Sequence, residues 1–496
     1  MGIDPQKGIH WPTMISCTVG LIALNMYTQL IQPNFPFLIK VYFPNIESSH
    51  VGYYAGYLIS MFFLGQIPGS IFWGWFADSY GRRYAMIIIS ILNMVCLLSL
   101  GLSQNYYLSL AIRLLHGLID GGLGVCKTIV ADLCNDSNIM IGTGQIFVGA
   151  AIGGVIGPLL GGYLSKKEAI RPLLHYLPFL KDMPYLLPFS VCAFLYLIVL
   201  VLFVFCAEET LSKEEIDNAR DIKKQMTREI STILRKSASK SFTSHEQLLL
   251  QYNSHSGYSS ILHNRDLFLT VTVYGLCAFN QISYDTIYPL MLMNPRSVGG
   301  FDMDAVEESW ISTIGVTTQV ATLLLCPVWT LLMPFRKQLF WINVVTTVLT
   351  FLQPAIALFN SSSVAMQFGV TFFDFGVMVC TRSIGFNLSI ALISNSTYKE
   401  FRATALGLGQ MIGGLFRFLG PFFIPTLFSW STNVGRFPVN YGFSFYVMGT
   451  IMILSTIMTA KISHETDLGK GSVHSTIKHK EVPASCLEDE VVGYHI

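Results

Sequence analysis

The densest group of chemically active side chains lies inside a long apolar run at about 105–131. Arg113, Asp120 and Lys127 are spaced seven residues apart, which is two helical turns, so they lie along one stripe of a helix. His116 is one turn from both Arg113 and Asp120 on the same side. Ionisable groups within a membrane span are costly, and they therefore indicate a function such as proton transfer or solute binding. The imidazole of His116 suits proton transfer because histidine titrates close to physiological pH.

Two structural interpretations of this group stay open. Arg113, Asp120 and Lys127 are also compatible with an internal ladder of salt bridges, and His116 is compatible with a hydrogen-bonded packing residue. Four glycines between positions 117 and 124 keep the surrounding surface small. A charged stripe cannot face lipid, so we expect it to line a cavity or to contact another helix.

Other apolar runs contain further ionisable residues. They are Asp285, Asp374, Arg382 and Arg417. Asp285 ends a polar stretch that begins at Asn280, which is typical of a solute site between the halves of a transporter. Alternatively, Asp285 lies in water near the end of its helix. Arg417 needs an anionic partner, for which Asp374 and Asp120 are candidates.

The composition predicts the elements that carry these residues. Of 496 residues, 52% are hydrophobic and 12% are charged, whereas a soluble domain has about 25% charged residues. Apolar runs of about 20 residues, long enough for a helix to cross a bilayer, recur along the chain. We expect twelve transmembrane helices, at about 12–38, 52–76, 84–102, 105–131, 139–164, 184–206, 265–290, 309–332, 338–358, 364–393, 403–428 and 440–462.

Six spans, a polar interval and six more spans predict an all-α membrane protein with two pseudo-symmetric six-helix halves. One amphipathic helix is expected near 212–235, and the C-terminal tail is expected to be disordered. The predicted divisions are a cytoplasmic N-terminus (1–11), an N-terminal bundle (12–206), a cytoplasmic linker (207–264), a C-terminal bundle (265–462) and a cytoplasmic tail (463–496).

The distribution of Lys and Arg predicts the orientation. These residues are concentrated in the segments that share a side with both chain ends, which places the ends and the linker in the cytoplasm. The segment after the fifth span, with Lys166 and Lys167, is against this bias. The sequon at Asn360 then faces outside, and its glycosylation stays open. The N-terminus lacks a cleavable signal pattern, so the first span is expected to act as the insertion signal.

Several classes of function are disfavoured. The net charge of +1 gives no electrostatic reason for binding nucleic acid. The ten cysteines include no CxxC pair and lie mostly in apolar runs, so they predict neither a disulfide framework nor a metal site. The sequence has no phosphate-binding loop and no nucleophile motif. We therefore expect no cofactor and no enzymatic activity.

The segment between the second and third spans carries a motif. It contains Gly74, Asp78, Gly81, Arg82 and Arg83. Gly81 permits a tight reversal, and the two arginines are expected on the cytoplasmic side. The pattern resembles the loop between helices 2 and 3 of the major facilitator superfamily, although Ser79 stands where a basic residue is usual. The resemblance implies a cytoplasmic latch, and an ordinary turn with two orienting arginines is the alternative.

The fifth predicted span is rich in glycine. It contains Gly144, Gly153, Gly157, Pro158, Gly161 and Gly162. Glycines at these intervals form a smooth face for close helix packing, and the proline removes one backbone hydrogen bond. The spacing resembles the signature of the drug:proton antiporter branch of the same superfamily. General helix packing is the alternative explanation.

Several stretches in both halves look like the zinc-induced-facilitator-like carriers. They are 51–56, 72–74, 402–408, 417–421 and 427–431, together with the spacing of Arg113, Lys127 and Asp132. The sequence around Arg113 also resembles a pattern of proton-coupled members, in which the arginine takes part in proton coupling. Lys127 and Arg417 fall where that family has cations. The cysteine-rich N-terminal motif of the plant members is absent, and the central loop has only three histidines.

These observations predict a secondary transporter that works by alternating access. We expect proton-coupled export of a small organic solute, drug or metal chelate, with Arg113, Asp120 and His116 in proton coupling. Lys127, Asp285 and Arg417 are expected to set the charge selectivity of the cavity. A proton symporter or uniporter, or a membrane receptor or scaffold, is the alternative. The expected setting is a monomer in the bilayer of the plasma membrane or of a vacuole or lysosome.

Overall fold

The computed structural model describes residues 9–135, 138–166, 183–211, 264–330, 333–397 and 402–468 of the chain. The predicted amphipathic helix near 212–235 and the predicted disordered tail beyond residue 468 lie outside these residues. Within the described ranges the chain is helical apart from turns and one isolated bridge.

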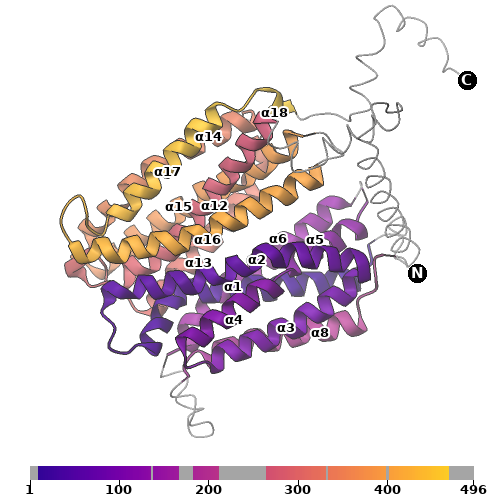
Figure 1. The fold of residues 1–496 in the computed structure, drawn as a ribbon, viewed down its shortest axis with the longest axis horizontal. Coiled ribbons are helices and arrows are strands. Elements are labelled where there is room, and N and C mark those ends of the chain that lie inside the picture. Colours follow the sequence, from indigo (N-terminus) through magenta and orange to yellow (C-terminus); the bar gives the residue numbers. More distant parts are fainter. Residues whose placement is uncertain are drawn as a thin grey trace, which may run out of the picture.

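The helices follow the predicted spans in order (Figure 1). The N-terminal helices are α1 (Trp11–Tyr42), α2 (Val51–Tyr80), α3 (Arg82–Leu102), α4 (Tyr106–Ile119), α5 (Gly122–Leu133), α6 (Ile139–Leu164) and α8 (Leu186–Phe205). The C-terminal helices are α12 (Arg265–Met293), α13 (Ala305–Thr330), α14 (Phe335–Leu352), α15 (Val364–Asn395), α16 (Arg402–Val434), α17 (Phe443–Ala460) and α18 (Glu465–Leu468). In the described residues, eleven spans are long and apolar enough to cross a membrane, and α13 lies at the remaining predicted position.

The predicted continuous helix at 105–131 is wrong, because this span is broken between α4 and α5. Asp120 has φ −74° and ψ 76°, which is not helical. Gly121 lies directly against the Trp73 side chain, so a residue with a Cβ would clash there. The Trp73 indole donates a hydrogen bond to the Leu118 carbonyl at 3.0 Å, which satisfies one of the carbonyls freed by the break.

The eighth span begins four residues earlier than predicted, at Ala305 rather than at 309. A capping box explains this start. The Asp304 carboxylate accepts from the amides of Val306 (2.9 Å) and Glu307 (2.8 Å), and the Glu307 carboxylate accepts from the Asp304 amide (2.9 Å). Glu308 is therefore inside the helix.

The chain forms two bundles that lie side by side (Figure 1). Helices α1 to α8 form the first bundle and α12 to α17 form the second, as predicted for two six-helix halves. We call the end that holds residues 11, 80, 205, 265 and 402 the inner end, and the opposite end the outer end. The inner end is the predicted cytoplasmic side.

The two halves pack closely at the outer end. A Cβ on Gly52 of α2 would lie 2.8 Å from the Pro425 carbonyl oxygen of α16, and one on Gly56 would lie 3.1 Å from the Pro425 side chain. A Cβ on Gly162 of α6 would lie 2.7 Å from the Ala305 carbonyl oxygen of α13. These glycines let helices of opposite halves approach backbone to backbone, which closes the outer end.

Three glycines nearer the inner end have no such contacts. A Cβ on Gly74 of α2, Gly144 of α6 or Gly407 of α16 would meet no atom within 4 Å. The close approach between the halves at Gly52, Gly56 and Gly162 is therefore not repeated at these three positions.

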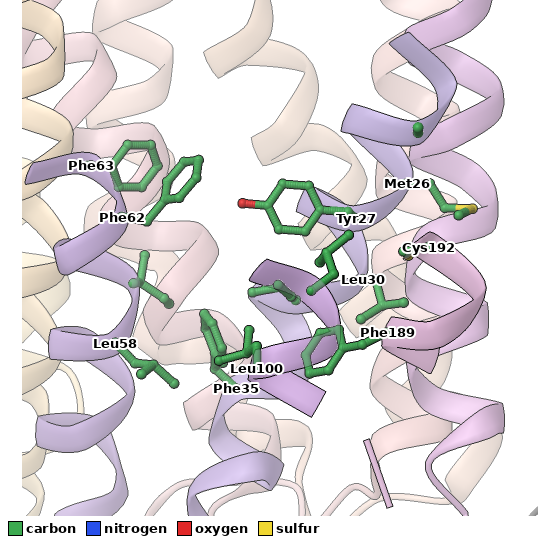
Figure 2. Packing of buried hydrophobic residues seen from close by; sticks show 14 of the residues in the cluster. Met26, Tyr27, Leu30, Phe35, Leu58, Phe62, Phe63, Leu100, Phe189 and Cys192 are labelled. Carbon is green, nitrogen blue, oxygen red and sulfur yellow. The ribbon is translucent and has the colours of Figure 1, made fainter. Parts of the chain in front are cut away.

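The first half has a dense apolar core (Figure 2). Tyr27 of α1 points toward Phe62 of α2, with ring centroids 6.2 Å apart in an edge-to-face arrangement. Phe189 and Cys192 of α8 pack beside α1 in the same cluster. The core fixes α1, α2 and α8 as one unit, and Tyr27 carries a hydroxyl into it.

The Asn360 sequon is engaged in a structural role. Its side-chain amide donates to the carbonyls of Arg296 (3.0 Å) and Gly300 (3.1 Å). A glycan would use the same nitrogen. The conformation therefore holds the Asn360 side chain in contact with the neighbouring outer turn.

Candidate functional site

Arg113 lies in the core of the first half rather than on an open stripe. Its guanidinium donates to the Leu58 carbonyl and to the Tyr27 hydroxyl, both at 3.2 Å. It also lies over the rings of Phe62 and Phe35, at 4.5 and 5.1 Å from their centroids. These contacts stabilise a buried cation through cation–π attraction and hydrogen bonds.

His116 is fully buried beside Arg113. Its Nε2 shares a hydrogen bond with the Asn93 side-chain oxygen at 2.7 Å, and its ring stacks on Tyr27 with centroids 4.5 Å apart. Among the described residues its Nδ1 has no partner. His116 and Arg113 therefore both contact Tyr27.

Asp120 occupies the break in the fourth span. One carboxylate oxygen accepts from the Gln66 amide at 2.8 Å, and the other is buried with no partner among the described residues. Asp120 makes no ion pair with Arg113 or with Lys127 in this part of the chain, so the alternative ladder of salt bridges is not formed there. Lys127 lies beyond the break and is exposed.

A polar cavity lies between the two halves. It has a volume of about 70 Å³ and receives side chains from α1, α12, α13 and α15. The polar residues that line it are Gln29, Gln32, Gln281, Asp285, Ser312, Gln319, Arg382 and Ser383. A site with this many amides, hydroxyls and charges suits a polar solute rather than a lipophilic one.

Arg382 is the main cation of this cavity. Its guanidinium lies 3.5 Å from the centroid of the Tyr284 ring, and its Nη1 lies 3.8 Å from the Asp285 carboxylate. The side chain is 6% exposed, and none of its three nitrogens has a hydrogen-bond partner among the described residues. A planar guanidinium with free donors is suited to bind a carboxylate or a similar anion in two places.

Asp374 does not line this cavity, although it was predicted with the cavity residues. Its carboxylate accepts from the Gln353 amide at 2.6 Å and from the Tyr284 hydroxyl at 3.3 Å. It borders a mainly apolar groove between α14 and α15. Tyr284 thus contacts both Asp374 and Arg382.

Arg417 has neither of its predicted carboxylate partners. It donates to the Tyr274 hydroxyl at 2.6 Å and to the Gln410 side-chain oxygen at 3.1 Å. In the described ranges no carboxylate lies within ion-pair distance of it. Its charge repels that of Lys127 in the opposite half. Two cations from different halves therefore lie close enough to repel each other, and neither has an ion pair among the described residues.

The arginines of the predicted latch are bound within the first half. Arg82 pairs with Asp132 at the end of α5. The backbone amides of Arg82 and Arg83 donate to Glu209, at 2.9 and 3.1 Å. The Arg83 guanidinium donates to two carbonyls at the end of α8, where the helix dipole favours a cation.

The other latch residues leave the inner end open. Gly81, with φ +109°, makes the predicted tight reversal. Asp78 is exposed, and Gly74 has open space around it. In this conformation the loop does not bridge the two halves through these side chains.

The glycines of α6 mostly pack against α1. A Cβ on Gly153 would lie 2.8 Å from the Met26 amide, and one on Gly157 would lie 3.0 Å from the Leu30 amide. Gly161 continues this contact, Pro158 lies within the helix, and Gly144 faces open space. Among the glycines of the motif, Gly162 is the one that contacts the other half, and Gly154 of the same helix lies against Val316 of α13. The motif therefore fixes α6 on α1 and closes the outer end.

The sequence analysis missed two kinds of site residue. Gln29, Gln32 and Gln319 line the cavity, and long polar side chains inside apolar runs were the available signal. Glu308 is buried inside α13 but was placed outside the predicted span at 309–332. The capping box at Asp304 was the signal that could have placed it correctly.

Comparisons with known proteins agree with this architecture. The family model of the Major Facilitator Superfamily matches residues 15–421. The protein zinc induced facilitator 1 of Arabidopsis thaliana is 26% identical over 474 residues, covering 92% of each chain. The multidrug resistance protein MdtG of Enterobacter lignolyticus is 26% identical over 218 residues, which is 43% of this chain and 48% of that protein.

A similar fold occurs among solved structures. The crystal structure of a D-xylose-proton symporter superposes with a TM-score of 0.68 at 13% sequence identity, and the match covers 93% of this chain and 99% of the symporter. At this identity the match concerns the fold alone.

Proposed function

The chain belongs to the Major Facilitator Superfamily, and we propose that it is a proton-coupled exporter of a small organic solute that works by alternating access. The observation that carries the proposal is the polar cavity between the halves, with Asp285 and Arg382 in its wall. The two halves approach closely at the outer end, at Gly52, Gly56 and Gly162, which supports a carrier that is closed on that side and loads from the inside.

Proton coupling is assigned to Asp120, together with Arg113 and His116. Asp120 is a carboxylate within the membrane region, with one hydrogen-bonded oxygen and one buried oxygen that has no partner in the described residues. Its position at the break of the fourth span lets protonation alter the contact with Gln66 on α2. Because α2 also touches α16 of the other half, a change at Asp120 can reach the interface between halves.

The cargo is proposed to be anionic or zwitterionic, and metal chelates belong to this class. Arg382 has donors without hydrogen-bond partners among the described residues in the cavity wall. Lys127 and Arg417 do not line this cavity, and they add positive charge elsewhere between the halves. The Asp285 carboxylate can accept hydrogen bonds from the ammonium group of a zwitterion. The relatives named for zinc induction and for multidrug resistance agree with export of chelates or drugs.

One chain is expected to suffice for transport, because the cavity lies between the two halves of the same chain. The membrane is proposed to be the plasma membrane or that of a vacuole or lysosome. In either setting the inner end would face the cytoplasm.

The test uses purified protein in liposomes that contain a trapped pH dye, under an imposed proton gradient. Organic anions, amino-acid-like chelators and lipophilic cations are added one at a time. We expect an anionic or zwitterionic cargo to dissipate the gradient, and the variant Asp120→Asn to abolish the effect. The control is Asp302→Asn, which neutralises an exposed carboxylate in a turn.

The alternatives give different results in the same assay. Cargo movement without proton movement indicates a uniporter, and proton movement in the same direction as cargo indicates a symporter. No movement of any cargo favours a receptor or scaffold.

A further inference from the structure

Glu308 is a buried carboxylate that the proposed mechanism does not use. It lies in the first turn of α13 and is 1% exposed. One oxygen accepts from the Ser312 hydroxyl at 2.6 Å, and the other has no hydrogen-bond partner among the described residues. No cation lies within ion-pair distance of Glu308 in this part of the chain. An ionised carboxylate is costly in such a place.

Glu308 lies between the outer contact of the two halves and the central cavity. Its neighbour Ser309 packs against Gly162 of the opposite half, in the contact that closes the outer end. Its hydrogen-bond partner Ser312 lines the central cavity. We call the contact of Gly162 with Ala305 and Ser309 the outer gate. Glu308 is thus the neighbour of a gate residue, and one hydrogen bond connects it to a residue that lines the cavity.

The described groups around Glu308 include no cation that pairs with it. From α12 and from the turn before α8, the phenols of Tyr288 and Tyr185 are close enough to interact with its charge. Arg382 of α15 lines the same cavity as Ser312 but pairs with Asp285.

Several other charged groups near this end of the described chain interact with one another. Lys166, at the end of α6, pairs with Asp304 at 3.1 Å. Glu307, the neighbouring acid on α13, caps the helix by accepting from the Asp304 amide. Lys40, in the last turn of α1, interacts with Asp302.

We propose that Glu308 is a proton-binding site that couples protonation to closure of the outer gate. When Gly162 and Ser309 separate, the Glu308 carboxylate meets water on the outer side and exchanges its proton there. Closure buries the group and therefore requires the protonated form. Proton binding from the outer side and outer closure thus stabilise each other.

The proton has a defined exit. In the inward-facing state, the carboxylic acid can pass its proton through the Ser312 hydroxyl to water in the cavity, which leaves the carboxylate behind. The next outer opening reloads it. This route rests on the proposed proton-coupled transport, but the linkage between protonation and gate closure does not, so the two can fail separately.

The test measures the outer gate without any cargo. Purified full-length protein in lipid nanodiscs is followed by hydrogen–deuterium exchange at the outer ends of α6 and α13, over a range of pH. Exchange is corrected for its intrinsic pH dependence. We expect opening to increase with pH, by at most about tenfold per pH unit for one coupled proton. The variant Glu308→Gln mimics the neutral acid and should keep the gate closed at every pH.

Two further variants keep the result interpretable. Glu307→Gln changes the adjacent, less buried acid and should retain the pH response of the native protein. Ser312→Ala removes the hydrogen bond to Glu308, so it should shift the response to higher pH without abolishing it, and it should slow proton delivery to the inner side in the liposome assay. Native melting behaviour and a single species on size-exclusion chromatography identify folded variants. A folded Glu308→Gln protein with a native pH response, or a native protein whose gate ignores pH, overturns the proposal.

Discussion

The Lys166 ammonium lies 3.1 Å from the Asp304 carboxylate and joins the end of α6 to the start of α13. The two residues belong to opposite halves. Beside them, the Trp310 indole donates to the Tyr163 hydroxyl at 3.0 Å across the same interface. These polar contacts border the glycine contact at Gly162, so the outer gate combines close backbone packing with a partly exposed ion pair.

We expect loss of the Lys166–Asp304 ion pair to have a small effect on closure of the outer gate. Lys166→Gln should weaken outer closure by about 0.2–1 kcal/mol, the usual range for an exposed pair. An impermeant maleimide added outside should label an introduced Ser309→Cys faster in the Lys166→Gln background. Arg296→Gln, which removes another exposed outer cation, is the control. Equal labelling rates in both backgrounds would show that the pair does not stabilise closure.

The pH dependence of this pair has a definite sign. Partial burial of Asp304 acts to raise its pKa, but the Glu307 and Val306 amides and the Lys166 ammonium outweigh burial and hold the pKa below its ordinary value of 3.8. The stabilisation is therefore present above pH 3.8 and is lost as the pH falls through the lower pKa of the folded protein. The labelling difference caused by Lys166→Gln should stay constant near neutral pH and disappear only in strong acid.

The glycines of α6 predict opposite outcomes at its two ends. Gly162→Val places a side chain against Ala305 and Ser309, so the outer gate should fail to close and transport should be lost. The larger side chain of Gly144→Val would extend into open space in this conformation. It should still close the outer gate. Maleimide labelling of the outer ends separates the two variants, and a Gly162→Val protein that transports normally would exclude the backbone contact as the gate.

Arg382 predicts the charge preference of the cavity. Arg382→Gln should weaken binding of a carboxylate-bearing cargo by about 30-fold or more, because a buried charged contact contributes about 2 kcal/mol or more. Arg382→Lys keeps the charge but loses the planar fork, so it should rescue binding only in part. Equilibrium binding of labelled cargo to purified protein measures both. Unchanged affinity in a folded Arg382→Gln protein would place the anion elsewhere, with Lys127 and Arg417 as the next candidates.

Replacement of Arg382 also leaves the Asp285 carboxylate without the cation that pairs with it. The double variant Asp285→Asn with Arg382→Gln should therefore be more stable than Arg382→Gln alone. Thermal melting without cargo measures this difference. The comparison separates a loss of cargo binding from a loss of folding.

Much of the fold could be predicted from the sequence because spans are defined by the length and apolarity of local runs. The helix starts at Arg265 and Val364 were placed at the observed residues. The break at Asp120 could not be predicted in this way, because it depends on Trp73 of another helix packing against Gly121. The early start at Ala305 has a local signal, the capping box at Asp304, but a criterion based on apolar runs overlooks it.

The site was less predictable because it depends on which face of each helix meets another helix. Asp285 and Arg382 were identified as embedded charges, and the fold brings them together. Asp374 looked equivalent in sequence, but it turns toward Gln353 and Tyr284. Regular spacing placed Lys127 on a stripe with Arg113, whereas the break leaves Lys127 exposed.

Asp78 provides the last prediction, which concerns the inner end. In this conformation Asp78 is exposed, while Arg82 and Arg83 are held by Asp132 and Glu209. Closure of the inner end would bring the end of α2 toward the start of α16, where the positive end of the helix dipole attracts a carboxylate. This attraction contributes about 0.3–1 kcal/mol, and up to about 2 kcal/mol when partly buried.

Asp78→Asn should therefore destabilise the inner-closed state, slow transport and leave expression largely unchanged. An introduced Gly407→Cys near the start of α16 should react faster with an inner-side thiol reagent in this background, because the inner end spends more time open. Glu465→Gln, which neutralises an exposed acid of α18 at the same end, should change neither rate. If transport and labelling in Asp78→Asn match the native protein, the loop is an ordinary turn oriented by its two arginines, and closure of the inner end depends on other contacts.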